Sequence, residues 1–280
     1  CVMKLTVVVD NMVSHSMPRP LRAEHGYALL IEIGGKKILL DAGQSDVAVH
    51  NLSLLGVHPD ELDAIAISHG HYDHASGLIH VLKHRTKPVP VYGHSAIFTE
   101  RYSVAGGKRR YIGISNSQEE LETVGAQFCL SEKPQEIIDE LVISGTVTKN
   151  TEYEKGDKKL VLLRENGEEV QDELVDDTSL YYKHPEGLVV LSGCAHSGFV
   201  NTVEHGFKVL GVNKLIGWVG GTHLGPVSKI QQEKTLAQIE AYKPQFIAAS
   251  HCTGFVMMGE LERRLGEVFI SGMVGKVIQA

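Results

Sequence analysis

Short apolar runs alternate with polar and glycine-rich stretches along the whole 280-residue chain. The runs are rich in Val, Ile and Leu and are bounded by Gly, Asp, Pro or His, as is typical of buried strands. Gly34-Gly35 between two such runs predicts a two-residue hairpin turn. The predicted strands are Leu5–Val9, Ala28–Ile33, Lys37–Leu40, Ala64–Ile67, Val89–Tyr92, Leu141–Val147, Leu160–Leu163, Leu188–Leu191, Lys214–Val219, Phe246–Ala249 and Val268–Ile270.

A helical period of apolar residues appears between these runs. Strands with helices packed outside them predict a layered α/β protein in which two sheets face each other. Residues 95–178 carry most of the loop character, and we expect one domain over residues 1–280 with an elaborated insertion at about 95–178. The predicted helices are Val47–Leu55, Gly77–Lys83, Asn201–Leu210, Val227–Tyr242 and Gly259–Leu265.

Composition limits the class of protein. Apolar residues make up 42% of the chain and charged residues 22%, which is ordinary for a globular protein. The formal net charge of −7 argues against nucleic acid as a partner, although a local basic loop could still hold a small phosphorylated substrate. No apolar run is long enough to cross a membrane, and the first residues enter a strand-like run without the layout of a signal peptide.

Cysteine usage points to a reducing compartment. The four cysteines are widely spaced, with no CxxC pair, and are therefore not expected to form a disulfide framework. Cytoplasm is the expected location. The four are Cys1, Cys129, Cys194 and Cys252.

The segment Ser68-His69-Gly70-His71-Tyr72-Asp73-His74 carries the strongest chemical pattern. It follows an apolar strand and precedes a predicted helix. His69 and His71 are two residues apart in an extended loop, so both imidazoles can point to one side, and Asp73 and His74 fall at the start of the helix. Two imidazoles on one ion, with Asp and His on a second, suit zinc, iron or manganese. The alternative, a His-rich surface loop, is disfavoured because four potential ligands stand at one strand end.

His-Gly-His-Tyr-Asp-His resembles the HxHxDH motif of the metallo-β-lactamase superfamily, and further motifs follow in that family's order. Leu39–Gly43 is similar to the strand end whose Asp, here Asp41, orients the metal loop. Leu191–His196 is similar to the strand that delivers the third His of the first metal site. Ala249–Cys252 is similar to the strand that delivers His251, the last His of the second. The resemblance implies a four-layer αββα sandwich.

The resemblance also implies a ligand set for one or two divalent metal ions, with zinc expected and manganese or iron as alternatives. Such ions would lower the pKa of a shared water and polarise a phosphoryl or carbonyl oxygen. Asp73 would also take part in catalysis. Without the resemblance, His196 and His251 are simply His residues at strand ends. The implied first site is His69, His71 and His196, and the implied second site is Asp73, His74 and His251.

One departure from the family pattern concerns the residue that usually bridges the metals. Between His196 and His251 the family places an Asp or Cys, whereas the matching strand end here is Gly220-Gly221-Thr222-His223. His223 could ligate a metal, contact substrate or act in catalysis, but an imidazole cannot bridge as a carboxylate does. Cys194 and Cys252 stand beside ligand positions and are expected to be small buried fillers, with metal ligation or redox tuning as the alternatives.

A narrower resemblance points to the branch of 7,8-dihydropterin-6-methyl-4-(β-D-ribofuranosyl)aminobenzene 5′-phosphate synthases in methanopterin biosynthesis. Val9-Asp10-Asn11, Glu24-His25-Gly26 and Asp176-Asp177 are among the features that carry it, and they imply substrate contacts by Asn11, His25 and Asp177. Lys108-Arg109-Arg110 forms a basic, glycine-flanked loop that could hold a phosphate. A solvated turn explains those charges equally well.

Three functions follow from these patterns. The first is the pterin-linked condensation, a transferase reaction on a small phosphorylated substrate. The second is metal-dependent hydrolysis of a phosphoester or another small ester. The third, a binding protein that kept the fold and lost its metals, is disfavoured by the nearly complete ligand set.

Overall fold

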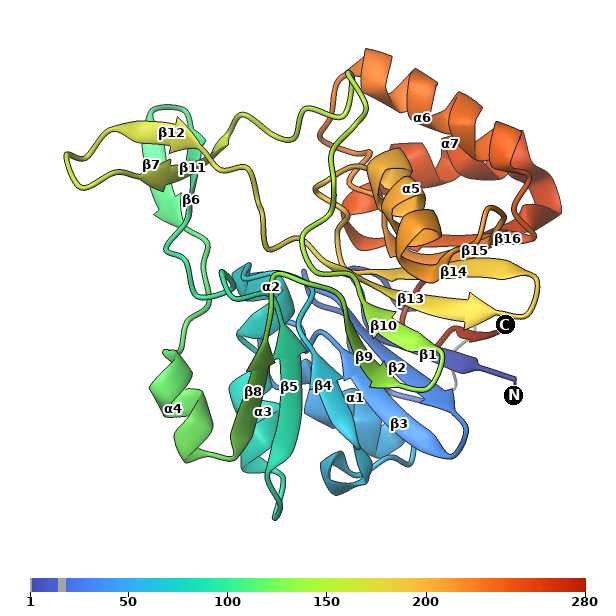
Figure 1. The fold of residues 1–280 in the computed structure, drawn as a ribbon. Helices are drawn as coiled ribbons and strands as arrows, with labels where there is room; N and C mark the ends of the chain where they lie inside the picture. Colours follow the sequence, from blue (N-terminus) through green and yellow to red (C-terminus); the bar gives the residue numbers. More distant parts are fainter. Residues whose placement is uncertain (1, 15–18) are drawn as a thin grey trace.

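The computed structural model describes residues 2–14 and 19–280 and contains two seven-stranded sheets that face each other (Figure 1). Cys1 lies outside the described residues. Gly34 and Gly35 both have positive φ, 57° and 78°, and form the predicted hairpin turn. The first sheet has the order β18 (Val277–Gln279), β1 (Lys4–Val9), β2 (Ala28–Ile33), β3 (Lys36–Leu40), β4 (Ala64–Ala66), β5 (Val89–Gly93) and β8 (Ala126–Leu130).

The second sheet is built mainly from the C-terminal half of the chain. Its neighbouring strands β14, β15, β16 and β17 are parallel, so their carboxyl ends lie at one edge. Its order is β17 (Phe269–Ser271), β16 (Phe246–Ser250), β15 (Leu215–Gly221), β14 (Gly187–Ser192), β13 (Ser179–His184), β10 (Leu141–Ile143) and β9 (Gln135–Ile138).

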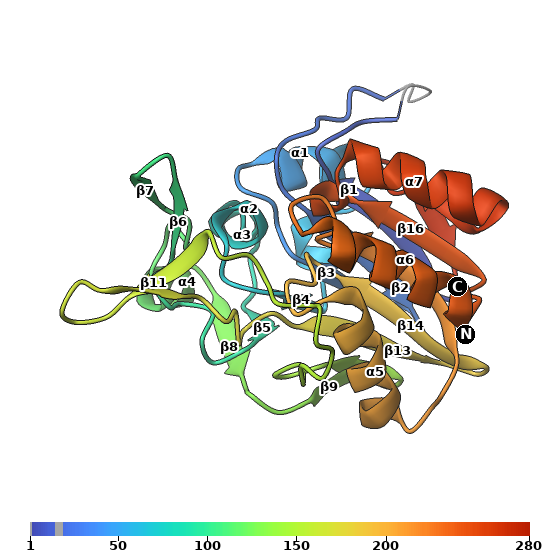
Figure 2. The same ribbon diagram turned by 90° about the horizontal axis from the view of Figure 1, so that it is seen from above.

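Helices cover the outer face of each sheet, which confirms the αββα sandwich (Figures 1 and 2). The five predicted helices are present, with ends shifted by a few residues in some cases. The first sheet is covered by α1 (Val47–Leu54), α3 (Leu78–Lys83) and α4 (Gln118–Thr123), and the second by α5 (Phe199–Leu210), α6 (Lys229–Tyr242) and α7 (Phe255–Leu265). Short 3₁₀ turns occupy Pro59–Glu61, His251–Thr253 and Gly266–Val268.

Strand residues alternate between two apolar layers. In β2, Leu29 and Ile31 pack between the two sheets, whereas Ala28 and Leu30 pack beneath the first sheet's helices. Both faces are buried, which explains why every residue of the strand except Glu32 is apolar. A third cluster lies beneath the other helices, where Phe199 of α5 stacks on Trp218 of β15 at a centroid distance of 4.1 Å.

The segment 95–178 contains more strand than its polar sequence indicated. β8, β9 and β10 extend the two main sheets, and a four-stranded antiparallel sheet projects to one side (Figures 1 and 2). The basic stretch from Lys108 is therefore a strand, not a loop, and Gly106-Gly107 forms the hairpin turn before it. This sheet has the order β12 (Glu169–Gln171), β11 (Leu160–Leu163), β6 (Tyr102–Ala105) and β7 (Lys108–Tyr111).

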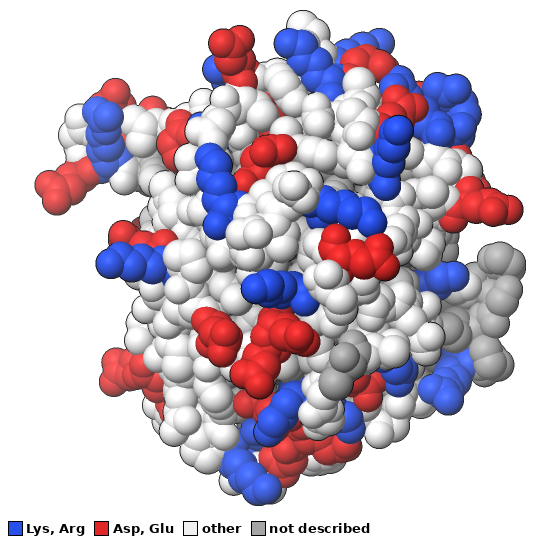
Figure 3. Space-filling model, turned by 45° about the vertical axis from the view of Figure 1, so that its right-hand side comes forward, with Lys and Arg blue, Asp and Glu red and all other residues white. Residues whose placement is uncertain are grey.

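The surface carries both signs of charge. On the face shown in Figure 3, Lys and Arg side chains are interspersed with Asp and Glu. None of the helices among the described residues is long and apolar enough to span a bilayer.

Candidate metal centre

The segment after β4 forms one wall of a buried site. His71 precedes the short helix α2 (Tyr72–Ala75), which places Asp73 and His74 in its single turn. His69, His71, Asp73 and His74 are all buried. The ring centroid of His69 lies 4.5 Å from that of His71 and 4.3 Å from that of His74. The motif thus brings its ligand atoms to one place, at the end of a strand and the start of a helix.

The opposite wall comes from the second sheet. His196 follows β14, and its ring centroid lies 4.8 Å from those of both His69 and His71. His251 follows β16, and its Nε2 lies 3.1 Å from Nε2 of His74 and 3.3 Å from Oδ2 of Asp73. The residues of the two implied ligand sets are therefore next to one another, although they come from strands of different sheets.

Asp41, at the end of β3, fixes the tautomer of His74. Its carboxylate accepts hydrogen bonds from the backbone N–H and the hydroxyl of Ser68, each at 2.7 Å, and from Nδ1 of His74 at 2.6 Å. Since an ionised carboxylate only accepts, Nδ1 carries the proton and Nε2 keeps its lone pair. Asp41 therefore presents Nε2 of His74 to the interior of the site.

Asn11 does the same for His251. Its Oδ1 accepts from the backbone N–H of Gly26 at 3.3 Å and from Nδ1 of His251 at 2.9 Å. Asp10, which is also buried, accepts from the backbone N–H of His251 at 2.8 Å. The lone pairs on Nε2 of His74 and of His251 then face each other, an arrangement that is unfavourable unless a proton or a metal cation lies with them.

The electrostatics of the site keep several imidazoles neutral. Burial lowers the pKa of His71 to about 3 and lowers the pKa of His69 and of His196 well below the usual value. Neutral imidazole is the form that binds metals. Burial opposes protonation of His251 too, but its hydrogen bond with Asp73 and nearby negative charge raise its pKa to about 9. The pocket therefore favours a positive charge beside Asp73.

Whether this site fits a metal can be judged from the imidazole nitrogens that have no hydrogen-bond partner. Among the described residues, Nε2 of His71 and both ring nitrogens of His196 and of His223 are buried without a hydrogen-bond partner. Leaving such groups unsatisfied is costly, and each one calls for an explanation. Divalent metal ions supply it, because imidazole and carboxylate are ordinary ligands of zinc, iron and manganese. The residues present fit one or two such ions.

His223 follows β15, at the strand end that lacks the carboxylate usual in the family. Its ring centroid lies 4.1 Å from that of His196, and its backbone has a left-handed φ of 49°. Cys194 is buried, as expected, and its Sγ lies 3.1 Å from Nε2 of His74. Cys252 accepts a hydrogen bond from the backbone N–H of His223 at 3.3 Å. No local pattern could have revealed the contact of Cys194, since 120 residues separate it from His74.

A pocket of about 160 Å³ opens onto these side chains. Arg110 reaches its mouth, where the guanidinium lies over the ring of Tyr72 at 5.3 Å from the centroid. Ser103, Asp157 and Leu160 were not anticipated from the sequence and come from the projecting sheet and its connections. The lining residues are His25, His71, Tyr72, Asp73, Ser103, Arg110, Ile112, Asp157, Leu160, Cys194, His196, His223, His251 and Cys252.

Of the residues suggested as substrate ligands, some lie outside this pocket. Lys108 and Arg109 are exposed and do not line the pocket. Arg109 pairs instead with Glu169 at 3.5 Å. Asp177 lies behind His196, where its carboxylate accepts the backbone N–H groups of His196 and Ser197 at 3.0 and 2.8 Å. Asp177 therefore has its oxygens occupied by the turn that positions His196.

His25 does line the pocket. Its Nε2 lies 3.3 Å from Oδ2 of Asp73, its side chain is 54% exposed, and its Nδ1 lies 3.4 Å from Nδ2 of Asn11. It is the solvent-facing imidazole of the group formed with Asp73 and His251. A substrate entering from outside would meet His25 before the buried ligands.

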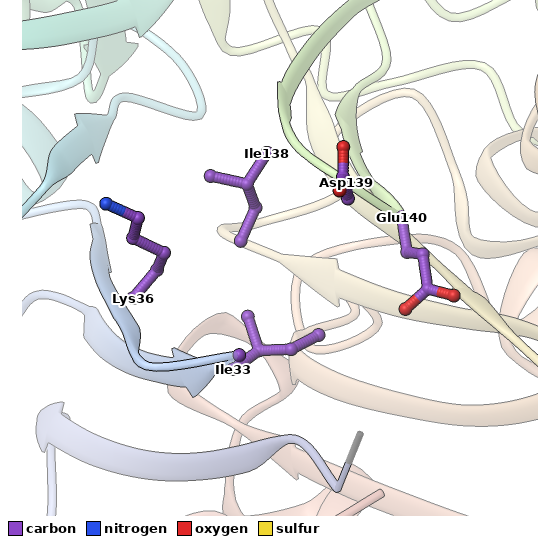
Figure 4. A pocket seen from close by; sticks show the side chains of 6 residues that line it. Ile33, Lys36, Ile138, Asp139 and Glu140 are labelled. Atoms are coloured by element: carbon purple, nitrogen blue, oxygen red, sulfur yellow. The ribbon is translucent and has the colours of Figure 1, made fainter.

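A larger hollow lies elsewhere, between the β2–β3 and β9–β10 turns, with a volume of about 770 Å³ (Figure 4). Its lining includes Ile33, Lys36, Ile138, Asp139 and Glu140, which project from these two turns on either side of it. These turns lie at the opposite ends of the strands from Asp41 and the His residues. The hollow lacks the convergent imidazoles and buried polar groups that mark the smaller pocket.

Comparison with known proteins identifies the class to which this fold and site belong. The metallo-beta-lactamase superfamily profile matches residues 21–200, more than half of the chain. The chain therefore belongs to the metallo-beta-lactamase superfamily, whose members typically bind divalent metals, and it is an enzyme of that class.

Individual relatives cover nearly the whole chain. An uncharacterised protein of Methanocaldococcus jannaschii is 34% identical over 98% of this chain and 99% of its own. The 7,8-dihydropterin-6-methyl-4-(beta-D-ribofuranosyl)-aminobenzene-5′-phosphate synthase of the same organism is 29% identical over 93% of this chain and 91% of its own. The crystal structure of a metal-dependent hydrolase of the beta-lactamase superfamily aligns with a TM-score of 0.82 at 25% identity, covering 99% of both chains.

Proposed function

We propose that this enzyme uses two metal ions to act on a small phosphorylated substrate, and that its reaction is the condensation of a dihydropterin with a ribofuranosylaminobenzene 5′-phosphate. The observation that carries this proposal is the presence of buried ring nitrogens without a hydrogen-bond partner in His71 and His196, which line one pocket together with Asp73. The synthase relative supports the choice of substrates.

The first ion would be held by His69, His71 and His196, and the second by Asp73, His74 and His251. Zinc suits this imidazole-rich donor set best, with manganese or iron as alternatives. When bound, such ions supply Lewis acidity that stabilises negative charge developing on a phosphate or pyrophosphate oxygen. Asp41 and Asn11 orient His74 and His251 through the Nδ1 hydrogen bonds described above.

Arg110 is the proposed phosphate ligand at the pocket mouth. Its guanidinium lines the pocket and is held over Tyr72, and a guanidinium can bind a phosphate with two parallel hydrogen bonds. The volume of about 160 Å³ is smaller than typical small-molecule sites of roughly 300–1,000 Å³. The pocket therefore holds the reacting end of the substrates, and the remainder extends along the projecting sheet.

The condensation joins the arylamine nitrogen to the pterin methylene carbon, breaks the bond from that carbon to pyrophosphate, and releases one proton from the nitrogen. His223 is the proposed acceptor of this proton, because both of its ring nitrogens are without a partner and it lines the pocket. His25, at the solvent side, is placed to contact the entering substrate.

The test is to incubate metal-loaded protein with 7,8-dihydropterin-6-methyl pyrophosphate and ribofuranosylaminobenzene 5′-phosphate, and to follow products by mass spectrometry. We expect the coupled product and pyrophosphate in equal amounts, with both lost in His71→Ala. The matched control is His80→Ala, which changes a His on α3, away from the pocket. Absence of coupling by a fully metal-loaded protein would rule out the synthase reaction.

A second candidate is metal-dependent hydrolysis of a phosphoester, favoured by the structural similarity to a metal-dependent hydrolase. In this reaction water replaces the arylamine, and the P–O or C–O bond of the ester breaks. The same incubation separates the two functions. Metal-dependent release of phosphate or pyrophosphate without a coupled product would identify a hydrolase.

A further inference from the structure

The thiol of Cys194 lies at the centre of the ligand cluster. It stands just after β14, is 3% exposed, and its Sγ is 3.1 Å from Nε2 of His74. On one side it groups with His69 and His196, and on the other with His74 and His251. Within each group, the potential ligand atoms all lie within 4.8 Å of one another. Cys194 is thus the residue shared by the two halves of the site.

The position of Cys194 matters because the end of β15, where the family places a bridging residue, has no acidic side chain. The stretch from Gly220 to His223 offers no carboxylate that could lie between two cations. We infer that Cys194 supplies the shared ligand instead, as a thiolate that contacts both metal ions. The inference rests on the proposed two-metal function and adds a ligand to it. Binding of the ions would displace the thiol proton of Cys194 to solvent.

Glycine residues allow the backbone around Cys194 to pack closely against its neighbours. A Cβ on Gly221 would lie 2.6 Å from Sγ of Cys252 and 3.2 Å from Cα of Cys194. A Cβ on Gly193 would lie 2.1 Å from Oγ of Ser68. Ala195 has a left-handed φ of 57°, which is strained for a residue other than glycine. Such strain is concentrated at functional sites. The ligand atoms of Cys194 and His196, on either side of Ala195, lie within 4.8 Å of each other.

A thiolate also affects the choice of metal. Thiolate with imidazole ligands favours zinc, cobalt or iron, whereas manganese prefers oxygen ligands. Cys252 is the natural comparison, because it too lies in the pocket and groups with Cys194 and His223, but with neither His69 nor His74. Its sulfur also contacts the backbone N–H of His223 and the carbonyl of Cys194. Of the cysteines in the described part of the chain, only Cys194 belongs to both the His69 and the His74 groups.

The experiment uses the full chain, freed of metal and reloaded with Co²⁺, and reads metal content by elemental analysis and the cobalt–thiolate charge-transfer band in the near ultraviolet. We expect the unaltered protein to bind two ions and to show the band. Cys194→Ser should lose the band and bind the second ion about tenfold or more weakly. Cys252→Ser and Cys194→Asp should each bind two ions. The thiolate band should be present in Cys252→Ser and absent in Cys194→Asp.

Two outcomes would overturn the inference while leaving the metal centre intact. One is full cobalt loading of the unaltered protein without a thiolate band, and the other is a band that survives in Cys194→Ser. Failure of the unaltered protein to bind any metal would instead refute the proposed function and the inference together. X-ray absorption at the zinc edge of unaltered, zinc-loaded protein needs no variant, and it should show a sulfur neighbour at about 2.3 Å.

Discussion

The carboxylate of Asp41 accepts a hydrogen bond from Nδ1 of His74 at 2.6 Å, with both side chains fully buried. The same carboxylate also holds the backbone and hydroxyl of Ser68. Since Ser68 immediately precedes the His-rich segment, one buried acid orients a ligand and positions the loop that carries the others. This relationship makes the geometry of the metal centre depend on a residue that does not itself lie in the pocket.

Replacing Asp41 by Asn is therefore expected to weaken metal binding. An amide can accept at one atom only, so it cannot hold Ser68 and His74 as the carboxylate does, and loss of such a supporting group typically costs about 10–100-fold in metal affinity. Competition with a chromogenic chelator measures the change. Asp63→Asn is the matched control, because Asp63 pairs with Lys36 near the surface. Equal affinities in both variants would contradict the role given to Asp41.

Arg110→Ala is expected to raise KM for the phosphorylated substrate while leaving the bound metal unchanged. Loss of a charge-assisted hydrogen bond of about 1.5–3 kcal/mol corresponds to roughly 10–150-fold in binding. Arg109→Ala on the same strand is the control, since Arg109 does not line the pocket. A similar rise in KM in both variants would show that general positive charge, not Arg110, binds the phosphate.

Metal binding is expected to stabilise the fold, because the ligands come from both sheets. At a free metal concentration about a thousandfold above the dissociation constant, the free energy of unfolding should rise by about 4 kcal/mol. Thermal melts with zinc and after chelation measure this difference. His71→Ala/His196→Ala should abolish most of the shift, and a full shift in that variant would place the stabilising ion elsewhere.

Arg101→Leu is expected to destabilise the protein by about 3–5 kcal/mol, the usual consequence of removing one partner of a buried ion pair. Arg101 is 1% exposed and contacts Asp176 at 2.6 Å, and the other oxygen of Asp176 accepts from the backbone N–H of Gly70 at 2.8 Å. Urea unfolding measures the loss. The exposed pair of Arg164 and Glu168 is the control, and Arg164→Leu should have little effect.

The sequence predicted the parts of the fold that local patterning controls. Strands such as Ala28–Ile33 are apolar except for one residue because both faces are buried, and the helices α5 and α7 show a clear apolar period. The strands β6 and β7 were missed because their sheet projects from the body, which leaves β7 exposed along its whole length and without an apolar pattern. β8 and β9 are edge strands of mixed polarity.

The residues of the site also fall into those that a local sequence pattern predicted and those that it did not. His69, His71, Asp73 and His74 stand together in the sequence, so their spacing alone indicated a metal site. His196 and His251 could be proposed only through the family resemblance. The position of Cys194 depends on how β14 packs beside the His-rich segment of the other sheet, and the separation of Arg110 from Lys108 and Arg109 depends on how β7 is oriented. Neither is encoded in a local pattern.

The most direct test of the two-metal centre is anomalous diffraction from crystals of zinc-loaded protein, with data collected on both sides of the zinc absorption edge. We predict two anomalous peaks, one within about 2.0–2.3 Å of ligand atoms of His69, His71 and His196, and one at similar distances from Asp73, His74 and His251. Zinc bound elsewhere, with no peak at either set, would contradict the account.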